Sequence, residues 1–181
     1  MGCSNGWGTS GEGGSDIPCV TTGRIVKDGN NEDQKNGVYY HYQAASVGTG
    51  SAITTNNANV PDTFCPLGWQ LPYGGKDGVY YNQSKSWRYL FDSYGITYDN
   101  GNNIETTKVK SYPFSYIHSG SFNLHTGMLY NMGPNGGYYW SSTIESSTNS
   151  YRMTINKNPV LSPSIFDQKR AGLALRCVTR N

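Results

Sequence analysis

Residues 151–156 alternate strictly between apolar and polar side chains, and this alternation limits the possible folds more than any other feature of the chain. Successive side chains of a β-strand point to opposite faces of a sheet, so a period of two predicts a strand with one buried face. We expect a core to take the apolar residues, which are Tyr151, Met153 and Ile155. We expect solvent to meet the polar residues, which are Arg152, Thr154 and Asn156.

Other segments predict further short strands and one helix. Strands are expected at 38–42, 138–142 and 173–178. A helix is expected at 84–94, with Ser84 as its N-cap and Gly95 as its stop. Its apolar residues follow helical spacing at Trp87, Leu90, Phe91 and Tyr94. The stretch between Asn156 and Arg170 has no helical or strand period.

The composition indicates a loop-rich fold with an aromatic core. Tyrosines number 15 and glycines 23, which supply rings for a core and residues for tight turns. Charged residues make up only 14% of the chain and the net charge is +2, which is too weak a field to predict a nucleic acid or an anionic membrane as partner. No apolar run approaches the ~20 residues of a membrane span.

The chain divides into a predicted tether and one predicted domain. Residues 1–22 are rich in Gly and Ser and predict a flexible tether, whereas residues 23–181 are enough for one domain with a core. Cysteines stand at 3, 19, 65 and 177, and the sequence leaves their three pairings open. An even number of cysteines and a low charge favour an extracytoplasmic location, at a cell surface, secreted or on a virion. Cys3 is expected either to carry a lipid anchor or to pair with Cys19.

Three motifs resemble a bacterial family. "CPLGWQLP" (65–72), "GGYYWSST" (136–143) and "GLALRCV" (172–178) are similar, in this order and spacing, to the Fibrobacter succinogenes major paralogous domain, which has a C-type-lectin-like fold. "GVYYHYQAASVGTG" (37–50) and the stretch that begins "PFSYIHSGSFN" (113–123) and runs on through "GMLYNMGPNGGYYWSST" (127–143) resemble a subgroup that includes variable proteins of diversity-generating retroelements.

The resemblance implies a fold, a disulfide and a role. It implies a single α+β domain with short twisted antiparallel strands and one or two helices. It implies a Cys65–Cys177 disulfide, because the segment before the first helix lies beside the last strand in such folds. The three tryptophans expected in the core are Trp69, Trp87 and Trp140. Membership would imply display and ligand binding rather than catalysis.

The sequence offers no catalytic constellation, so we expect no enzyme activity. His41, His118 and His125 stand without a nucleophile signature, and no serine-hydrolase, zinc-protease or phosphate-loop motif occurs. Formylglycine-generating enzymes share the wider fold but use paired active-site cysteines. Cys65 and Cys177 are expected to be structural, so that activity is only a remote alternative.

Calcium is the one cofactor that the sequence leaves open. Oxygen ligands in the segment 99–105 stand at Asp99, Asn103 and Glu105, and the segment 28–33 has a similar spacing. Ordinary Asn-Gly turns explain the same residues, and the sugar-binding motifs of calcium-dependent lectins are absent. We therefore expect no bound metal or other cofactor.

The region 138–170 is the predicted binding surface. Exposed apolar residues between polar ones are typical of contact patches, although a satellite core under the loop would also explain Ile165 and Phe166. Retroelements substitute adenines, mainly in Asn-type codons, which yields Tyr, Ser, Asn, Ile, Phe, Asp, Arg or Thr but not Lys, Gln or Met. The residues that fit this set are Ile144, Asn149, Arg152, Thr154, Asn156, Asn158, Ser164, Ile165, Phe166 and Asp167. Tyr138 is expected to reach the same patch from the adjacent strand.

Two functions of different classes follow. The first is a displayed domain that binds a protein or surface ligand and is open to diversification. The second is a structural cell-surface or adhesin component that uses the fold as a spacer.

Overall fold

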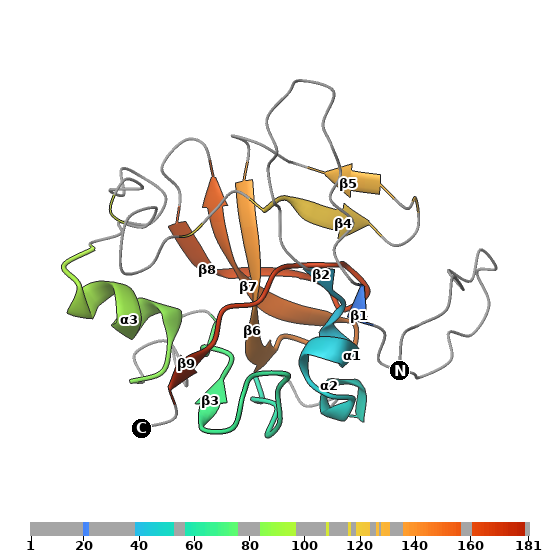
Figure 1. Ribbon diagram of the computed structural model, residues 1–181, viewed down its shortest axis with the longest axis horizontal. Coiled ribbons are helices and arrows are strands. Elements are labelled where there is room, and N and C mark those ends of the chain that lie inside the picture. Colours follow the sequence, from blue (N-terminus) through green and yellow to red (C-terminus); the bar gives the residue numbers. More distant parts are fainter. Residues whose placement is uncertain are drawn as a thin grey trace.

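Three antiparallel strands form the main sheet of the structure, which is a computed structural model (Figure 1). They are β6 (Gly136–Ile144), β7 (Asn149–Asn156) and β8 (Leu161–Gln168), and β7 lies between the other two. The structure describes residues 20–21, 39–52, 57–75, 84–96, 108, 116, 119–123, 126, 128–130, 136–156 and 161–179.

The other elements are short, so the protein is a loop-rich α+β domain with few helices and antiparallel sheets. The helices are α1 (Tyr42–Ala45), α2 (Thr49–Ala52) and α3 (Trp87–Ser93). The paired strands are β1 (Val20–Thr21) with β2 (Tyr39–Tyr40), β3 (Trp69–Gln70) with β9 (Val178–Thr179), and β4 (Ser121–Asn123) with β5 (Met128–Tyr130).

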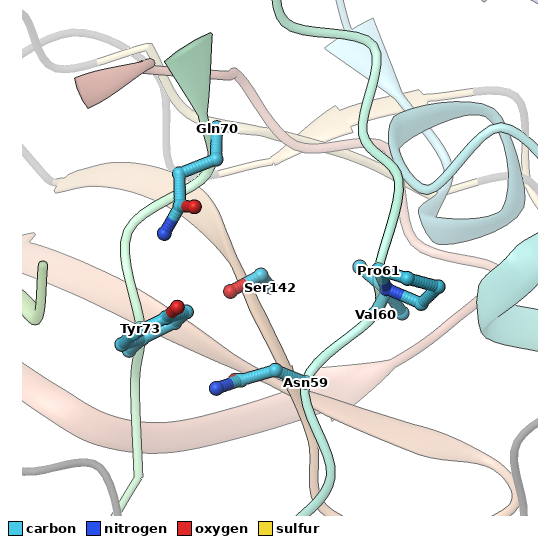
Figure 2. A pocket seen from close by; sticks show the side chains of 6 residues that line it. All are labelled: Asn59, Val60, Pro61, Gln70, Tyr73 and Ser142. Atoms are coloured by element: carbon cyan, nitrogen blue, oxygen red, sulfur yellow. The ribbon is translucent and has the colours of Figure 1, made fainter. Parts of the chain in front are cut away.

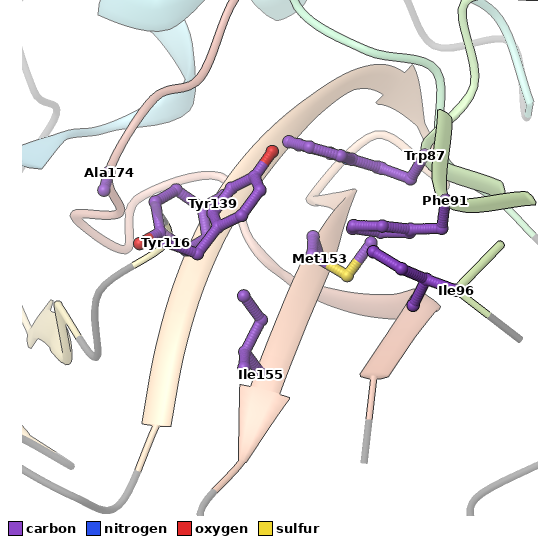
Figure 3. Packing of buried hydrophobic residues seen from close by; sticks show 8 residues of the cluster. All are labelled: Trp87, Phe91, Ile96, Tyr116, Tyr139, Met153, Ile155 and Ala174. Atoms are coloured by element: carbon purple, nitrogen blue, oxygen red, sulfur yellow. The ribbon is translucent and has the colours of Figure 1, made fainter. Parts of the chain in front are cut away.

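One face of the main sheet packs against α3. Met153 and Ile155 of β7 and Tyr139 of β6 join Trp87 and Phe91 of α3 in one buried cluster (Figure 3). The Tyr116 ring meets the Tyr139 ring edge-on, with centroids 4.9 Å apart. The prediction that Tyr151, Met153 and Ile155 are buried is confirmed, with exposed fractions of 6%, 0% and 1%. Burial of several rings and aliphatic chains is the main favourable contribution to folding.

The opposite face is buried as well. Tyr138, Trp140 and Ile144 of β6 pack in a second cluster with Tyr42 of α1 and with Leu173. The Trp140 indole donates a hydrogen bond of 2.7 Å to the carbonyl of Tyr40. Because both faces are covered, every residue of β6 is buried.

Backbone segments from distant parts of the chain bind the outer edge of β6. The Gly120 N–H donates to the Gly136 carbonyl at 2.9 Å, and the Trp140 N–H donates to the Ala174 carbonyl at 3.1 Å. The Ser142 N–H donates to the Pro72 carbonyl at 2.9 Å. Hydrogen bonds therefore satisfy both edges of β6, although it is an outer strand of its three-stranded sheet.

A bulge interrupts the pairing of β6 with β7 between Trp140 and Ile144. Hydroxyl groups take over the backbone hydrogen bonds there. Ser141 donates to the Tyr151 carbonyl at 2.9 Å, and Ser150 donates to the Thr143 carbonyl at 2.7 Å. A bulge leaves backbone groups without ladder partners, and buried polar groups must be paired. This need accounts for the buried Ser-Ser-Thr run after Trp140.

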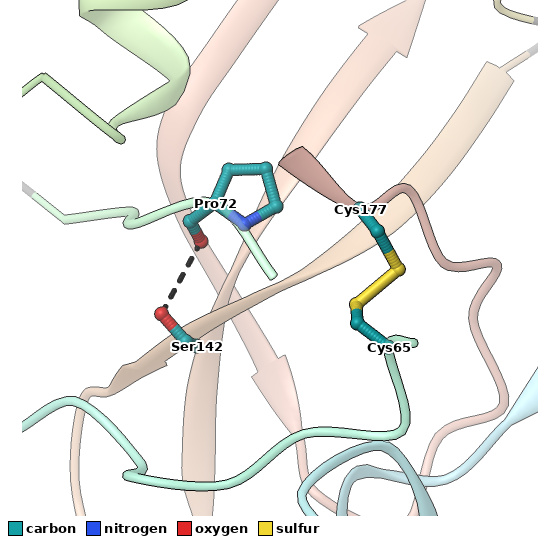
Figure 4. Close-up of a disulfide and its surroundings, with 4 residues drawn as sticks. All are labelled: Cys65, Pro72, Ser142 and Cys177. Atoms are coloured by element: carbon teal, nitrogen blue, oxygen red, sulfur yellow. Dashed lines mark hydrogen bonds between the residues drawn. A yellow bond between two sulfur atoms is a disulfide. The ribbon is translucent and has the colours of Figure 1, made fainter. Parts of the chain in front are cut away.

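A disulfide joins Cys65 to Cys177, with the Cα atoms 5.9 Å apart, and confirms the predicted pairing (Figure 4). It links residues 112 positions apart. The strands β3 and β9 pair just beyond the two cysteines, with Gln70 opposite Val178. The end of the chain is thus held against the segment that precedes α3.

The helix prediction and two of the strand predictions need correction. The helix begins later than predicted, with Ser86 as N-cap, whose hydroxyl accepts from the Tyr89 N–H at 3.0 Å. Gly95 follows it at φ +63°, as expected of a stop, but Tyr94 is already the C-cap and is exposed. The strand predicted at 38–42 ends at Tyr40 because His41 caps α1.

The last strand and the stretch before it also differ from the prediction. Only Val178–Thr179 forms a regular strand, and Leu173 and Ala174 make isolated bridges to Tyr40 and Tyr139. The stretch without a period contains β8 (Leu161–Gln168). Trp87 and Trp140 are buried as predicted, whereas Trp69 is 42% exposed because its two-residue strand lies at the rim of the domain.

The predicted tether and the predicted calcium loops fall mainly outside the described residues. Cys3, Cys19, Asp99, Asn103 and Glu105 lie there. The last residues of the predicted tether, Val20–Thr21, pair with β2 and so are joined to the domain.

Replacement of Cys65 and Cys177 together by alanine should lower the stability strongly. The bridge closes a long loop, and the chain-entropy estimate for such a loop is roughly 4–5 kcal/mol. Thermal unfolding of the double variant beside the wild type measures the difference. A melting temperature equal to that of the reduced wild type is expected, and one equal to the oxidised wild type would contradict the pairing.

Thr143→Val should destabilise the domain by about 1–3 kcal/mol. The Thr143 hydroxyl accepts from the buried Gly74 N–H at 3.0 Å and donates to the Asn59 side chain at 2.5 Å, and valine leaves both groups without this partner. Urea unfolding provides the measurement, and Thr126→Val, at an exposed threonine, is the control.

Candidate binding surface

The strand β8 exposes two large apolar side chains next to each other. Ile165 is 37% exposed and Phe166 is 45% exposed. Consecutive strand residues point to opposite faces, so one lies on each face of the sheet. Ile165 pairs with Arg152, and Phe166 pairs with Tyr151, whose ring it meets edge-on with centroids 6.5 Å apart. Among the described residues, neither Ile165 nor Phe166 belongs to the two buried clusters.

Arg152 is the charged centre of the face that carries Ile165. Its Nε lies 3.2 Å from Oδ2 of Asp167, and its guanidinium lies over the Tyr138 ring at 4.5 Å from the centroid. It also donates a hydrogen bond to the Thr154 hydroxyl. Burial lowers the pKa of Arg152, and the Asp167 carboxylate opposes that shift. The guanidinium is therefore held in one orientation, with 14% of the side chain exposed.

Tyr138 supports this arrangement from β6, whereas the sequence predicted it as a contact residue of the patch. It pairs with Thr154 across the sheet and is 8% exposed. Its ring forms the base on which the guanidinium of Arg152 lies. Tyr138 thus belongs to the surface as a support for Arg152 more than as a contact of its own.

Besides Tyr138, two more of the predicted contact residues are buried, and their prediction as solvent-facing residues is wrong. Ile144 has no exposed surface and packs in the second cluster. Thr154 lies on the face opposite Met153, as its alternation requires, but it is only 2% exposed. The alternation identified two faces correctly. It could not show that a second layer of the domain covers both.

The remaining predicted residues are placed differently. Asn149 is half-buried in the β6–β7 turn, where its amide donates to Glu145 at 3.3 Å. The backbone of Ser164 and Asn156 lies in β8 and β7, but their side chains are outside the described part of the structure, as is all of Asn158. The residues brought together on one face are therefore Tyr138, Arg152, Ile165 and Asp167, whereas Phe166 lies on the other face beside Tyr151.

Sequence reasoning missed the strand β8 and the lysine that follows it. Pro163 has no backbone N–H, which is tolerated on an outer strand such as β8, and it removes the strand signal from the sequence. Lys169 is 9% exposed and donates from Nζ to the Gly50 carbonyl at 3.0 Å. This bond ties the end of β8 to α2. Because lysine side chains are usually exposed, the sequence gives no sign that this one is buried.

The described residues contain no group of three or more His, Cys, Asp or Glu side chains placed to hold a metal ion. Of the histidines, His41 is described, and its Nδ1 accepts from the Ala44 N–H at 3.4 Å. His118 and His125 lie outside the described residues. Within the described part of the chain, no helix is long and apolar enough to cross a membrane.

Comparisons with known proteins return no match: no family model, no curated protein and no solved structure shows significant similarity to this chain.

Met153→Ala should cost roughly 2–5 kcal/mol of stability, since it opens a cavity in the cluster beneath α3. Ile165→Ala should stay within about half a kcal/mol, as at ordinary surface positions. Urea unfolding of both variants tests the assignment of core and surface. A loss at Ile165 comparable to that at Met153 would contradict the proposed surface.

Proposed function

We propose that this chain is a displayed ligand-binding domain of the C-type-lectin-like class, related to the Fibrobacter succinogenes major paralogous domain. The mutual contacts of the three family-like motifs support this. Pro72 accepts a hydrogen bond from Ser142, Trp140 donates to Ala174, and Cys65 is bonded to Cys177. Segments that resemble one family in order and spacing therefore also form one continuous structural unit. A disulfide is compatible with the extracytoplasmic location that display requires.

The observation that carries the proposal is the pair of exposed apolar side chains on β8. Ile165 stands beside the Arg152–Asp167 ion pair on one face of the sheet, and Phe166 stands beside Tyr151 on the other face. Arginines and exposed aromatic rings are among the residue types on which binding energy concentrates in interfaces. Arg152 is already fixed by Tyr138 and Asp167, so little side-chain entropy would be lost on binding. The partner is a protein or another surface ligand.

Diversification, if the gene undergoes it, should act on β8 more than on β6. Ile165, Phe166 and Asp167 fit the set of residues that adenine substitution produces, and they are exposed or half-exposed. Ile144 also fits that set but lies in the core, where changes of side chain would be costly. The expected genomic finding is a second, adenine-rich copy of the segment that encodes 138–170, next to a reverse-transcriptase gene. Adenine differences should concentrate in the codons of β8.

Phe166→Ala should abolish ligand recognition while the melting curve stays close to that of the wild type. Its ring is 45% exposed, so its loss removes contact area for a partner and little core packing. Binding of the fluorescently labelled protein to a panel of bacterial cells, followed by flow cytometry, provides the measurement.

Tyr89→Ala is the matched control, because Tyr89 is a similarly exposed ring, at 49%, but lies on α3. Retained binding by the control and lost binding by Phe166→Ala support the proposal. Equal binding by both variants and the wild type would contradict a role for β8. Absence of binding to every cell type would favour the alternative of a structural spacer.

A further inference from the structure

The two outer edges of the main sheet differ in whether other parts of the chain cover them. At the β6 edge, the Val60 N–H donates to the Ser142 carbonyl and the Ser142 N–H donates to the Pro72 carbonyl, both at 2.9 Å. Figure 2 shows the segments that carry Val60 and Tyr73 on the two sides of Ser142. The opposite edge of the sheet is β8, whose one neighbour in the main sheet is β7. Backbone groups on the outer side of such a strand can pair with another chain.

The pairing of β8 with β7 shows which residues direct their backbone groups outward. The register runs without a shift through residues 165–168 of β8. Just beyond them, the Lys169 N–H donates to the Thr148 carbonyl at 2.9 Å. Bonded and non-bonded positions alternate along an antiparallel ladder, so every second residue counted back from Lys169 bonds to β7. The N–H and C=O groups of Gln168 and Phe166 therefore point away from β7.

Gln168 uses its outward groups within the chain, whereas Phe166 does not. The Gln168 N–H donates to Oδ1 of Asp167 at 2.8 Å, and its carbonyl accepts from the Ala171 N–H at 2.8 Å. Within the part of the chain that the structure describes, no residue bonds to the outward N–H or C=O of Phe166. Further along β8, Pro163 has no N–H to donate. Phe166 thus offers one donor and one acceptor to another polypeptide backbone.

We propose that β8 pairs antiparallel with β8 of a second copy of this chain, with the two Phe166 residues opposite each other. In this register each Phe166 N–H donates to the Phe166 carbonyl of the other copy, so a two-fold axis satisfies the free donor and acceptor of both chains. The pairing requires neither an N–H at Pro163 nor the groups of Gln168 that are already bonded. It joins two three-stranded sheets into one continuous sheet.

The side chains of β8 also fit this register. On one face, the Phe166 ring stands beside Tyr151, with centroids 6.5 Å apart, and the second Phe166 continues this row of rings across the axis. On the other face, Asp167 comes opposite Ile165 of the second copy, so like charges do not meet directly. Arg152 already balances the charge of Asp167, with Nε and Oδ2 3.2 Å apart. A second copy supplies this match by symmetry, which favours it over an unrelated strand.

The dimer goes beyond the proposed ligand binding and does not rest on it. Residues opposite each other in a ladder point to the same face of a sheet, so the two Arg152–Asp167 pairs lie on one face of the joined sheet. Such a dimer presents two copies of that face to one ligand-bearing surface, which strengthens attachment by avidity. Because self-pairing is measured without a ligand, its failure and the failure of ligand binding are separate results.

Sedimentation equilibrium of the full chain tests the self-pairing. The contact is small, so the wild type should change from monomer to dimer only at high concentration, between about 10 μM and 1 mM. Phe166→Lys should raise the dimer dissociation constant about tenfold or more, because it removes the rings and places two lysines opposite each other. Tyr89→Lys is the matched control, since Tyr89 is a similarly exposed ring on α3, and it should dimerise like the wild type.

Disulfide trapping tests the register. Opposite residues of a hydrogen-bonded antiparallel pair have Cα atoms about 5.5 Å apart, which lies within the disulfide range of about 4.4–6.8 Å. Phe166→Cys should therefore form a bond between two chains under mild oxidation, identified by mass spectrometry of the joined peptides. Gln168→Cys is the control at an exposed position of the same strand, because the two new cysteines would stand four residues out of register, about 14 Å apart along the strand.

Three results would each overturn the proposal. The first is a wild type that stays monomeric over the whole concentration range. The second is a Phe166→Lys variant, with a melting curve like that of the wild type, that dimerises as tightly as Tyr89→Lys. The third is cross-linking of Gln168→Cys as fast as that of Phe166→Cys.

Discussion

Hydrogen bonding along both edges of β6 is the constraint on which the rest of the structure depends. One edge pairs with β7, and the other receives, in turn, the backbone of Gly120, Ala174, Pro72 and Ala58. These partners come from three parts of the chain, around 58–72, 120 and 174. The strand also joins both clusters, one through Tyr139 and the other through Trp140. The disulfide then holds the last segment in place, because Cys177 follows Ala174 and pairs with the segment before Pro72.

This arrangement limits where the protein can meet a partner. The side chains of β6 are buried on both faces, and those of β7 largely so, which leaves β8 as the strand of the main sheet with exposed apolar residues. A ligand that binds there would contact a surface whose charged residue, Arg152, is already braced by Tyr138 and Asp167. Changes on β8 can therefore alter recognition with little effect on the core. A change at Ile144 or Thr154 would act on the interior instead.

Much of the framework could be predicted from the sequence because it depends on local patterns. The alternation at 151–156 identified a strand and its α3-facing side, and the spacing of Trp87, Leu90 and Phe91 identified the helix. The Cys65–Cys177 pairing came from a resemblance, since four cysteines alone leave three pairings open. The strand β8 escaped prediction because Pro163 and its neighbours show no alternation, and a strand at the edge of a sheet needs none to be held by β7.

The sequence by itself determined which residues share a face, because the period of a strand or helix is a property of the local backbone. It also determined where α3 stops, since Gly95 adopts a positive φ that other residues disfavour. Only the tertiary structure decided whether a face meets solvent. Thr154 and Ile144 are buried because separate segments, with Tyr42 and Leu173 among them, cover the second face of the sheet.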